Sequence, residues 1–168
     1  IDQGARAQWQ EIEVFPPYEF TIDQGQALWE IKFPDGLTYS DCFNGSQSGV
    51  RHLYPRFDTD SGEVETLEVA INRCRVTHGL TALNYGGEEL IALTAYMSFV
   101  SRGNTISIIV SGDDPKAMAA YEEGKRFYYT KRGQLNFSCS DCHVTSAGQY
   151  VRSDRLSAGL GHPTHFPV

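Results

Sequence analysis

The sequence Cys139-Ser140-Asp141-Cys142-His143 constrains this chain more than any other feature. In the spacing C-x-x-C-H, two thiols on one turn can add to the two vinyl groups of a haem, and the adjoining imidazole can then reach the iron. The pattern therefore predicts covalent haem c on Cys139 and Cys142, with His143 as an axial ligand of the iron.

Three other interpretations of this motif are weaker. A redox dithiol usually follows a strand of a βαβ unit, whereas the segment before this motif is a predicted helix that ends near Gly133. A zinc site would need a second pair of ligands, and Cys42 and Cys74 are single and far apart. A disulfide between Cys139 and Cys142 would close a small strained ring, so haem attachment is favoured.

Length, composition and charge exclude several classes of protein. The 168 residues suit one ordinary domain or two small ones, and 40% hydrophobic residues can supply a buried core. A net charge of −7 argues against binding nucleic acid by phosphate neutralisation. No uncharged apolar run approaches the roughly 18 residues of a membrane span. The first residues lack a basic segment followed by an apolar one, so we expect that an export signal has been removed.

Hydrophobic periodicity predicts a mainly α chain. Residues 1–60 are rich in aromatic residues, Pro and Gly, and are predicted to be mostly loop with one short helix near 27–32. Two amphipathic helices are predicted over 63–76 and 88–101, with apolar faces made by Val64, Leu67, Ile71 and Cys74 and by Leu90, Leu93, Met97 and Val100.

A third helix is predicted to begin at Asp114-Pro115, because Asp is a good N-cap and Pro is favoured at the first helical position. This helix contains Gly124 and Phe127, and a short loop joins it to the C-x-x-C-H motif, the order found at the start of a cytochrome c domain. After Gly133 the chain is predicted to be irregular. Only residues 144–168 follow the motif, which leaves no room for closing helices, so we expect this domain to be truncated.

The first half of the chain contains a degenerate copy of the motif. Ser40-Asp41-Cys42-Phe43 matches Ser140-Asp141-Cys142-His143 at three positions, and Gly25, Leu28 and Trp29 parallel Gly124, Phe127 and Tyr128. Tyr39 and Phe43 then replace a haem thiol and the iron ligand. We interpret the chain as two cytochrome c-like domains, with residues 1–110 degenerate and haem-free and 111–168 haem-binding and incomplete; a chance match is the alternative.

The remaining cysteines and histidines give weaker signals. In an exported protein, thiols such as Cys42 and Cys74 usually pair, and two separate buried thiols remain the alternative. His52 and His78 are expected to face solvent. His162 and His165 could approach the haem from its far side or be polar loop residues. Arg152 and Arg155 could hold an anionic substrate or lie on a solvated loop.

Several longer stretches resemble the SoxA family, the larger subunits of the SoxAX c-type cytochrome of bacterial sulfur oxidation. The stretches are 72–75, 93–103, 120–125 and the long run 128–143, which ends in the haem motif. The resemblance implies two cytochrome c-like domains, of which the second always holds haem. The chain is similar to the single-haem type, in which a disulfide takes the place of the lost haem, and this implies a Cys42–Cys74 bond.

The resemblance also implies a function. SoxA pairs with the haem protein SoxX in the periplasm, and the enzyme, an L-cysteine S-thiosulfotransferase, joins thiosulfate oxidatively to a cysteine of the SoxYZ carrier protein. Two electrons pass through the SoxX haem to a small c-type cytochrome. The family's catalytic cysteine follows a segment like 164–168, so we expect it beyond Val168. A plain electron-transfer cytochrome is the alternative function, and a non-catalytic docking scaffold is a third.

Overall fold

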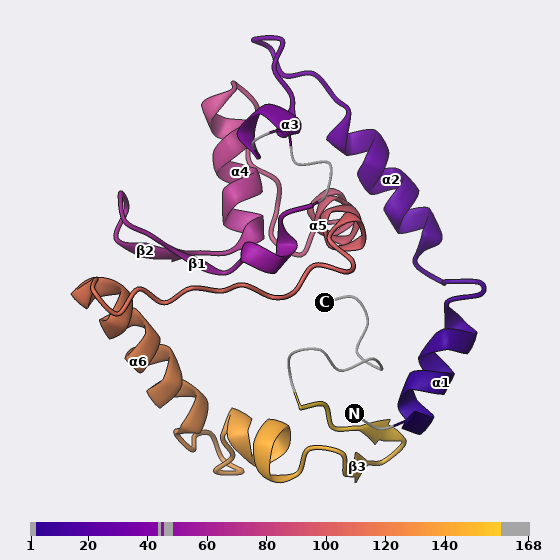
Figure 1. Ribbon diagram of the computed structural model, residues 1–168, viewed down its shortest axis with the longest axis vertical. Coiled ribbons are helices and arrows are strands. Elements are labelled where there is room, and N and C mark those ends of the chain that lie inside the picture. The colour runs from indigo at the N-terminus through magenta and orange to yellow at the C-terminus, as the bar shows by residue number, and fades with distance from the viewer. Residues whose placement is uncertain (1–2, 44, 46–48, 159–168) are drawn as a thin grey trace. The chain divides into compact units, whose positions relative to one another are not determined.

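The computed structural model describes residues 3–43, 45 and 49–158, and Figure 1 labels its elements. The chain divides into two compact units between Ser111 and Gly112. Residues 17–111 form the disulfide unit, which contains a Cys42–Cys74 bond. Residues 3–16 and 112–158 form the motif unit, which contains the C-x-x-C-H sequence. The homologous domains proposed above, 1–110 and 111–168, stay a prediction.

The prediction of a mainly α chain is confirmed, because helices dominate both units. The disulfide unit holds α2 (Glu19–Trp29), α3 (Tyr39–Cys42), a 3-10 helix (Arg51–Leu53), β1 (Arg56–Asp58), β2 (Glu63–Glu65), α4 (Leu67–Thr77) and α5 (Glu88–Val100). The motif unit holds α1 (Gln3–Ile12), α6 (Pro115–Tyr129), a π-helix (Asp141–Thr145), β3 (Tyr150–Val151) and β4 (Asp154–Arg155). Within the described ranges, no helix combines the length and the apolar character that crossing a membrane requires.

The core of the disulfide unit forms where α3, α4 and α5 bring their apolar faces together. Its largest fully buried side chains are Tyr39, Leu67, Ile71, Leu90, Leu93 and Met97. Most of these positions were predicted from helical periodicity in α4 and α5. Trp29, at the end of α2, stacks on Tyr39 with ring centroids 5.7 Å apart, so α2 contributes aromatic surface to the same core.

Close contact between α2 and α5 depends on a glycine. Gly25 is buried in α2, and a Cβ atom at this position would lie only 2.0 Å from the carbonyl oxygen of Ala92 and 2.6 Å from Cβ of Tyr96. Any side chain at this position would therefore push the two helices apart. The absent side chain allows the two backbones to approach closely.

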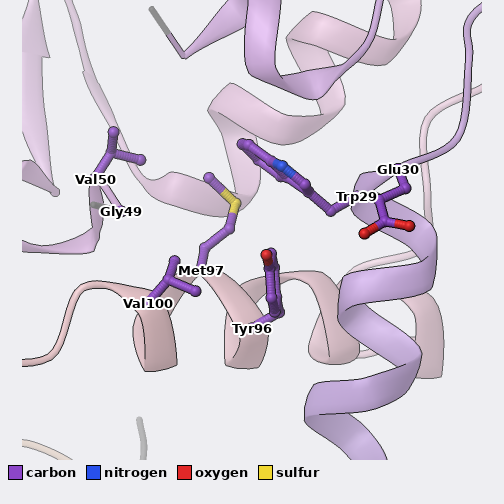
Figure 2. A pocket seen from close by; sticks show the side chains of 7 residues that line it. All are labelled: Trp29, Glu30, Gly49, Val50, Tyr96, Met97 and Val100. Atoms are coloured by element: carbon purple, nitrogen blue, oxygen red, sulfur yellow. The ribbon is translucent and has the colours of Figure 1, made fainter. Parts of the chain in front are cut away.

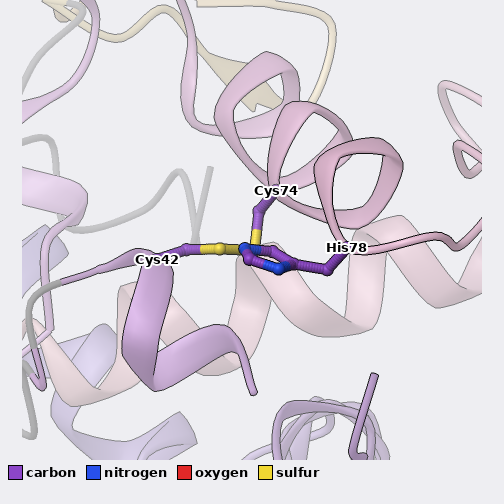
Figure 3. A group of neighbouring side chains, drawn as sticks. All are labelled: Cys42, Cys74 and His78. Atoms are coloured by element: carbon purple, nitrogen blue, oxygen red, sulfur yellow. A yellow bond between two sulfur atoms is a disulfide. The ribbon is translucent and has the colours of Figure 1, made fainter. Parts of the chain in front are cut away.

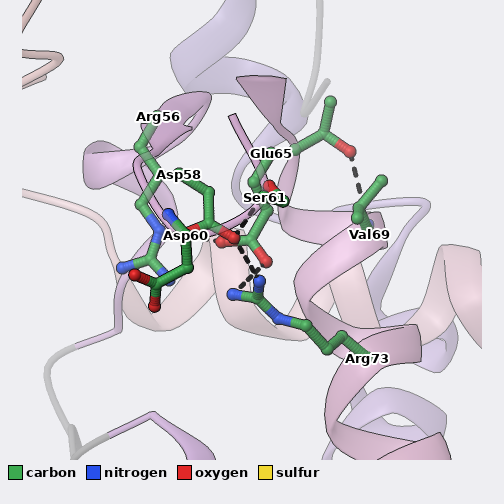
Figure 4. A network of polar contacts seen from close by, with 8 residues as sticks. Arg56, Asp58, Asp60, Ser61, Glu65, Val69 and Arg73 are labelled. Atoms are coloured by element: carbon green, nitrogen blue, oxygen red, sulfur yellow. Dashed lines mark hydrogen bonds and ion pairs between the residues drawn. The ribbon is translucent and has the colours of Figure 1, made fainter. Parts of the chain in front are cut away.

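A two-stranded antiparallel hairpin, β1–β2, precedes α4 and is tied to it by an ion-pair network (Figure 4). Arg73 of α4 pairs with Asp58 at 2.5 Å and with Glu65, which also accepts from Nε of Arg56 at 2.8 Å. The Arg73 guanidinium lowers the pKa of Asp58. Because Glu65 is buried, these arginines compensate a carboxylate that would otherwise be costly to remove from water.

The hairpin corrects the predicted start of the helix over 63–76. The helix begins at Leu67, and Thr66 is its N-cap, with its hydroxyl accepting a hydrogen bond from the backbone N–H of Val69 at 3.4 Å. Val64, which was assigned to the apolar helix face, lies in β2 and is 50% exposed. Thr66 is a favourable N-cap, so the helix begins after it. In residues 63–65, β-branched Val64 stands between two polar residues, a pattern that favours a strand.

The prediction that residues 1–60 are mostly loop is wrong. α1 and α2 cover much of this region, and α3 follows with a capping box in which Thr38 and Asp41 bond reciprocally. Pro16-Pro17 and Phe33-Pro34 lie just outside α2, so the Pro content marks the ends of helices rather than a long loop.

In the motif unit, the predicted start of α6 is confirmed. The Asp114 carboxylate accepts hydrogen bonds from the backbone N–H groups of Lys116 at 2.9 Å and Ala117 at 3.3 Å, and Pro115 is the first helical residue. The residues after Gly133 are more ordered than predicted. They form the π-helix and the β3–β4 hairpin, which pairs Tyr150 with Arg155.

Candidate haem site

The C-x-x-C-H motif lies on a capped helical turn of the motif unit. Cys139 and Ser140 are helical and lead into the π-helix Asp141–Thr145. The backbone N–H of Ser138 donates to the Asp141 carboxylate at 2.8 Å, and the backbone N–H of Asp141 donates to the Ser138 hydroxyl at 3.2 Å. Hydrogen bonding from Ser138 to the carboxylate, with its backbone N–H as the largest contribution, lowers the pKa of Asp141, and Lys131 at 3.7 Å adds to the effect. The cap holds the two cysteines on one turn.

His143 is oriented by a hydrogen bond to the backbone. Its Nδ1 lies 2.9 Å from the carbonyl oxygen of Ser157, a residue that is only 4% exposed. A carbonyl oxygen can only accept, so a neutral imidazole bonded to it carries its proton on Nδ1 and has the lone pair for a metal on Nε2. The Ser157 hydroxyl lies 3.3 Å from the same Nδ1. This is the arrangement expected of a histidine that binds a metal, whose second nitrogen donates to a carbonyl or carboxylate.

The two cysteines also fit covalent haem. Cys139 is exposed, Cys142 is half-buried, and neither belongs to a disulfide. Two free thiols on one turn and an imidazole with Nε2 available are the donor set that a c-type haem needs. The residues present therefore fit the group that the motif predicts.

The loop that joins α6 to the motif is held by Arg132. Its backbone N–H donates to the carbonyl of Phe137 at 3.0 Å, and its guanidinium lies 3.3 Å above the centre of the Phe127 ring. Nη2 of Arg132 also donates to the carbonyl oxygen of Phe127 at 2.5 Å. The end of α6 and the start of the motif are therefore linked through one side chain.

The sequence also offered two arginines as anion-binding residues and two histidines as residues near the haem. Arg155 donates from Nε to the carbonyl oxygen of Gly148 at 3.2 Å, so it helps to close the β3–β4 hairpin. Arg152 lies in the turn of that hairpin with φ of 58°. His162 and His165 lie outside the described residues.

The degenerate copy of the motif in the disulfide unit has the same kind of cap. The backbone N–H of Thr38 donates to the Asp41 carboxylate at 2.8 Å and lowers the pKa of Asp41, as Ser138 does for Asp141. At the places of the haem thiol and the iron ligand, Tyr39 and Phe43 are buried in the core. The two turns therefore share the same kind of cap, and buried aromatic side chains lie on the turn of the disulfide unit.

Tyr39 has a polar partner despite its burial. Its hydroxyl accepts a hydrogen bond from Nη1 of Arg75 at 2.7 Å, and Nε of Arg75 donates to the carbonyl oxygen of Thr81 at 2.9 Å. Burial raises the pKa of Tyr39, against the opposing effect of the guanidinium. The Tyr39 hydroxyl thus satisfies a buried arginine of α4.

Cys42 of α3 and Cys74 of α4 form a disulfide with their Cα atoms 6.0 Å apart (Figure 3). The bond contains the cysteine of the degenerate motif and joins it to the helix that carries Arg75. This is the pair that the family resemblance implies, and the structure leaves neither cysteine as a separate thiol.

The expectation that His78 faces solvent is wrong. Its side chain is only 18% exposed, and its ring stacks on Phe33 with centroids 5.3 Å apart. Nδ1 of His78 lies 2.6 Å from Oδ2 of Asp35, and this hydrogen bond lowers the pKa of Asp35. His52 is half-buried as well. Both histidines lie beside turn or basic residues in the sequence, and these neighbours do not indicate that the side chains are partly buried.

A pocket of about 340 Å³ opens between α2 and α5 (Figure 2). It is lined by Trp29, Glu30, Gly49, Val50, Tyr96, Met97 and Val100. The lining is mainly aromatic and aliphatic, with one carboxylate at Glu30. We assign it no ligand, because its lining alone does not select one.

Comparisons with known proteins show what this chain is similar to. Residues 24–106 match the family model described as SoxA/TsdA, cytochrome c domain. The matched residues all lie within the disulfide unit.

The chain is also similar to proteins named L-cysteine S-thiosulfotransferase subunit SoxA. Identity is 48% to the protein of Allochromatium vinosum and 44% to that of Chlorobaculum tepidum, over the whole of this chain in both cases. The chain covers 59% and 58% of these two relatives, so it spans about three fifths of their length.

Similarity extends to a solved structure, SoxXA from P. pantotrophus. The TM-score is 0.76 at 30% sequence identity, and the match covers 91% of this chain and 60% of the matched chain. The family model, the relatives matched along the whole chain and this fold similarity agree. The chain is therefore similar to SoxA proteins along its whole length.

Proposed function

We propose that this chain is part of a haem-dependent L-cysteine S-thiosulfotransferase, in which it holds one haem c through thioether bonds to Cys139 and Cys142. His143 is the proposed axial ligand of the iron. The observation that carries the proposal is the hydrogen bond between Nδ1 of His143 and the Ser157 carbonyl, because it leaves Nε2 available for a metal on a turn with two free thiols.

The proposed reaction joins thiosulfate to a cysteine of the SoxYZ carrier protein. In balanced form, carrier–SH and HS–SO₃⁻ give carrier–S–S–SO₃⁻, two protons and two electrons. A bound haem supplies one-electron transfer, so that the two electrons can leave in turn. In this chain, Ser138 and Asp141 hold the turn that carries the thioether bonds, and Ser157 fixes the protonated face of the His143 imidazole.

The proposed partners follow from the relatives. The similarity to SoxXA supports a haem-containing SoxX subunit as the partner that receives the electrons. A small c-type cytochrome would accept them from the complex, and the periplasm is the proposed compartment. A catalytic cysteine is proposed to follow Val168, as the family resemblance implies.

Haem attachment is tested by denaturing the protein. Each chain should keep its haem on a denaturing gel and gain about 616 Da, the mass of one haem added at C-x-x-C-H. The matched variants are Cys139→Ser with Cys142→Ser, which should release the haem, and Cys42→Ser with Cys74→Ser, which should retain it. Haem released from the unmutated protein by acid and organic solvent would refute the attachment.

The reaction is tested with the two-subunit protein, the carrier, thiosulfate and an electron acceptor. The carrier should gain about 112 Da, the mass of the added –S–SO₃⁻, only when all components are present. Reduction of the acceptor without any change in carrier mass would instead identify a plain electron-transfer cytochrome. Haem attachment and thiosulfate transfer can therefore fail separately.

A further inference from the structure

Three side chains of metal-ligand type meet within the disulfide unit. One ligand atom from each of Cys42, Cys74 and His78 lies within 4.8 Å of the others (Figure 3). Cys74 belongs to α4, His78 caps the end of the same helix, and Cys42 ends α3. Two elements thus bring two sulfurs and an imidazole together.

The imidazole of His78 is already oriented as a metal ligand would be. Nδ1 bonds to the Asp35 carboxylate at 2.6 Å, and stacking on Phe33, with planes inclined by 6°, fixes the plane of the ring. A carboxylate can only accept, so a neutral His78 imidazole carries its proton on Nδ1, and Nε2 is then the nitrogen with the lone pair. Histidines that bind metals almost always donate their second N–H to a carboxylate, a carbonyl or water. Hydrogen bonding of His78 to Asp35 reproduces that arrangement without a metal.

We propose that reduction of the Cys42–Cys74 disulfide converts this cluster into a site for one zinc ion, with both thiolates and the His78 imidazole as ligands. A phosphine reductant would supply the two electrons: the disulfide, the phosphine and water give two thiols and the phosphine oxide. Zinc binding then displaces one proton from each thiol. Two thiolates and an imidazole are a donor set that zinc favours, and water can complete the tetrahedron.

The required movement is small. Tetrahedral zinc with sulfur at about 2.3 Å and nitrogen at about 2.0–2.1 Å needs its ligand atoms about 3.6–3.8 Å apart. The ligand atoms already lie within 4.8 Å, so the main change is separation of the two sulfurs once their bond is broken. Cys42 is half-buried, which leaves a route for the reductant and the ion.

Equilibrium dialysis of the haem-loaded two-subunit protein against Zn²⁺ tests the proposal. The protein is reduced, freed of phosphine, and dialysed at a zinc concentration at which the oxidised protein binds none. Elemental analysis should then find one zinc per chain. His78→Gln should weaken binding by at least 10-fold, whereas the matched variant His52→Gln should bind like the unmutated protein. Asp35→Asn should weaken it by about 10–100-fold, and Asp23→Asn, on the exposed face of α2, should have no effect.

A second measurement needs no variant. Alkylation of the reduced, haem-loaded protein, followed by peptide mapping, reports the reactivity of Cys42 and Cys74, because the proposed thioether bonds protect Cys139 and Cys142. Zinc should slow alkylation of Cys42 and Cys74. Equal alkylation with and without zinc, or zinc binding by folded His78→Gln as tight as that of the unmutated protein, would overturn the proposal. Its failure would leave the haem proposal untouched, because the two sites share no residue.

Discussion

The close packing of α2 on α5 makes Gly25→Ala a sharp test of the fold. A Cβ atom at Gly25 would lie 2.0 Å from the Ala92 carbonyl oxygen, at least 1.0 Å closer than the 3.0 Å below which real Cβ contacts essentially never occur. The obstacle is backbone rather than the end of a flexible side chain. The helices must therefore move apart, and the contacts around Tyr96 must loosen.

The size of the effect follows from two opposing terms. Overpacking a well-packed interface costs about 1–3 kcal/mol, and a rigid obstacle favours the upper end of this range. Replacing glycine by alanine within a helix stabilises the protein by up to about 1 kcal/mol, because alanine has the higher helix propensity. We therefore expect Gly25→Ala to lower the free energy of unfolding by about 2 kcal/mol, which corresponds to a fall in Tm of about 4–8 °C for a protein of this size.

Urea unfolding followed by circular dichroism measures this change. Gln24→Ala is the matched control, because Gln24 is the exposed neighbour of Gly25 on the same helix, and its replacement should change stability by no more than about 0.5 kcal/mol. If Gly25→Ala instead stabilises the protein by up to about 1 kcal/mol, as it would at a helical glycine with empty space around it, the close approach of the α2 and α5 backbones is wrong.

Three further predictions concern polar groups. Asp114→Ala removes the oxygen that caps the first turn of α6 and should cost about 1 kcal/mol in urea unfolding; an unchanged midpoint would mean that the cap contributes nothing. Tyr39→Phe leaves the buried Nη1 of Arg75 without its acceptor and should cost about 1–3 kcal/mol, unless water reaches the guanidinium, in which case stability is unchanged. Because Arg73 lowers the pKa of Asp58, the stability from this pair is present above the ordinary value of 3.8 and is lost as the pH falls through the lower folded value. Denaturation from pH 7 to pH 2.5 should show this loss, and Asp58→Asn should reduce it.

The sequence predicted the features that depend on neighbouring residues. The start of α6 follows from Asp114-Pro115, and the buried positions of α4 and α5 follow from spacing of three and four residues. The capped turns were also detectable in principle, since Ser138 and Asp141, like Thr38 and Asp41, are three residues apart. Local hydrogen bonds of this kind leave a pattern in the sequence.

Contacts between distant residues left no such pattern. Asp35 and His78 are 43 residues apart, and the residues near each gave no sign of the other. The acceptor for His143 is the backbone carbonyl of Ser157, which any residue could supply. The β1–β2 hairpin is short and depends on Arg73, a residue of the following helix, so periodicity extended the helix too far back.

The two pairs of cysteines in this chain need opposite oxidation states on the way to the mature protein. Cys42 and Cys74 are joined by a disulfide, whereas Cys139 and Cys142 must stay reduced until the proposed thioether bonds form. In the periplasm, the compartment proposed above, each pair could also exchange with the other. In a chain exported from its N-terminus, the earlier pair emerges first and can close before the later thiols are exposed. A delay in that closure would let Cys42 or Cys74 capture a haem-site thiol. The yield of mature protein then depends on the timing of thiol chemistry during export.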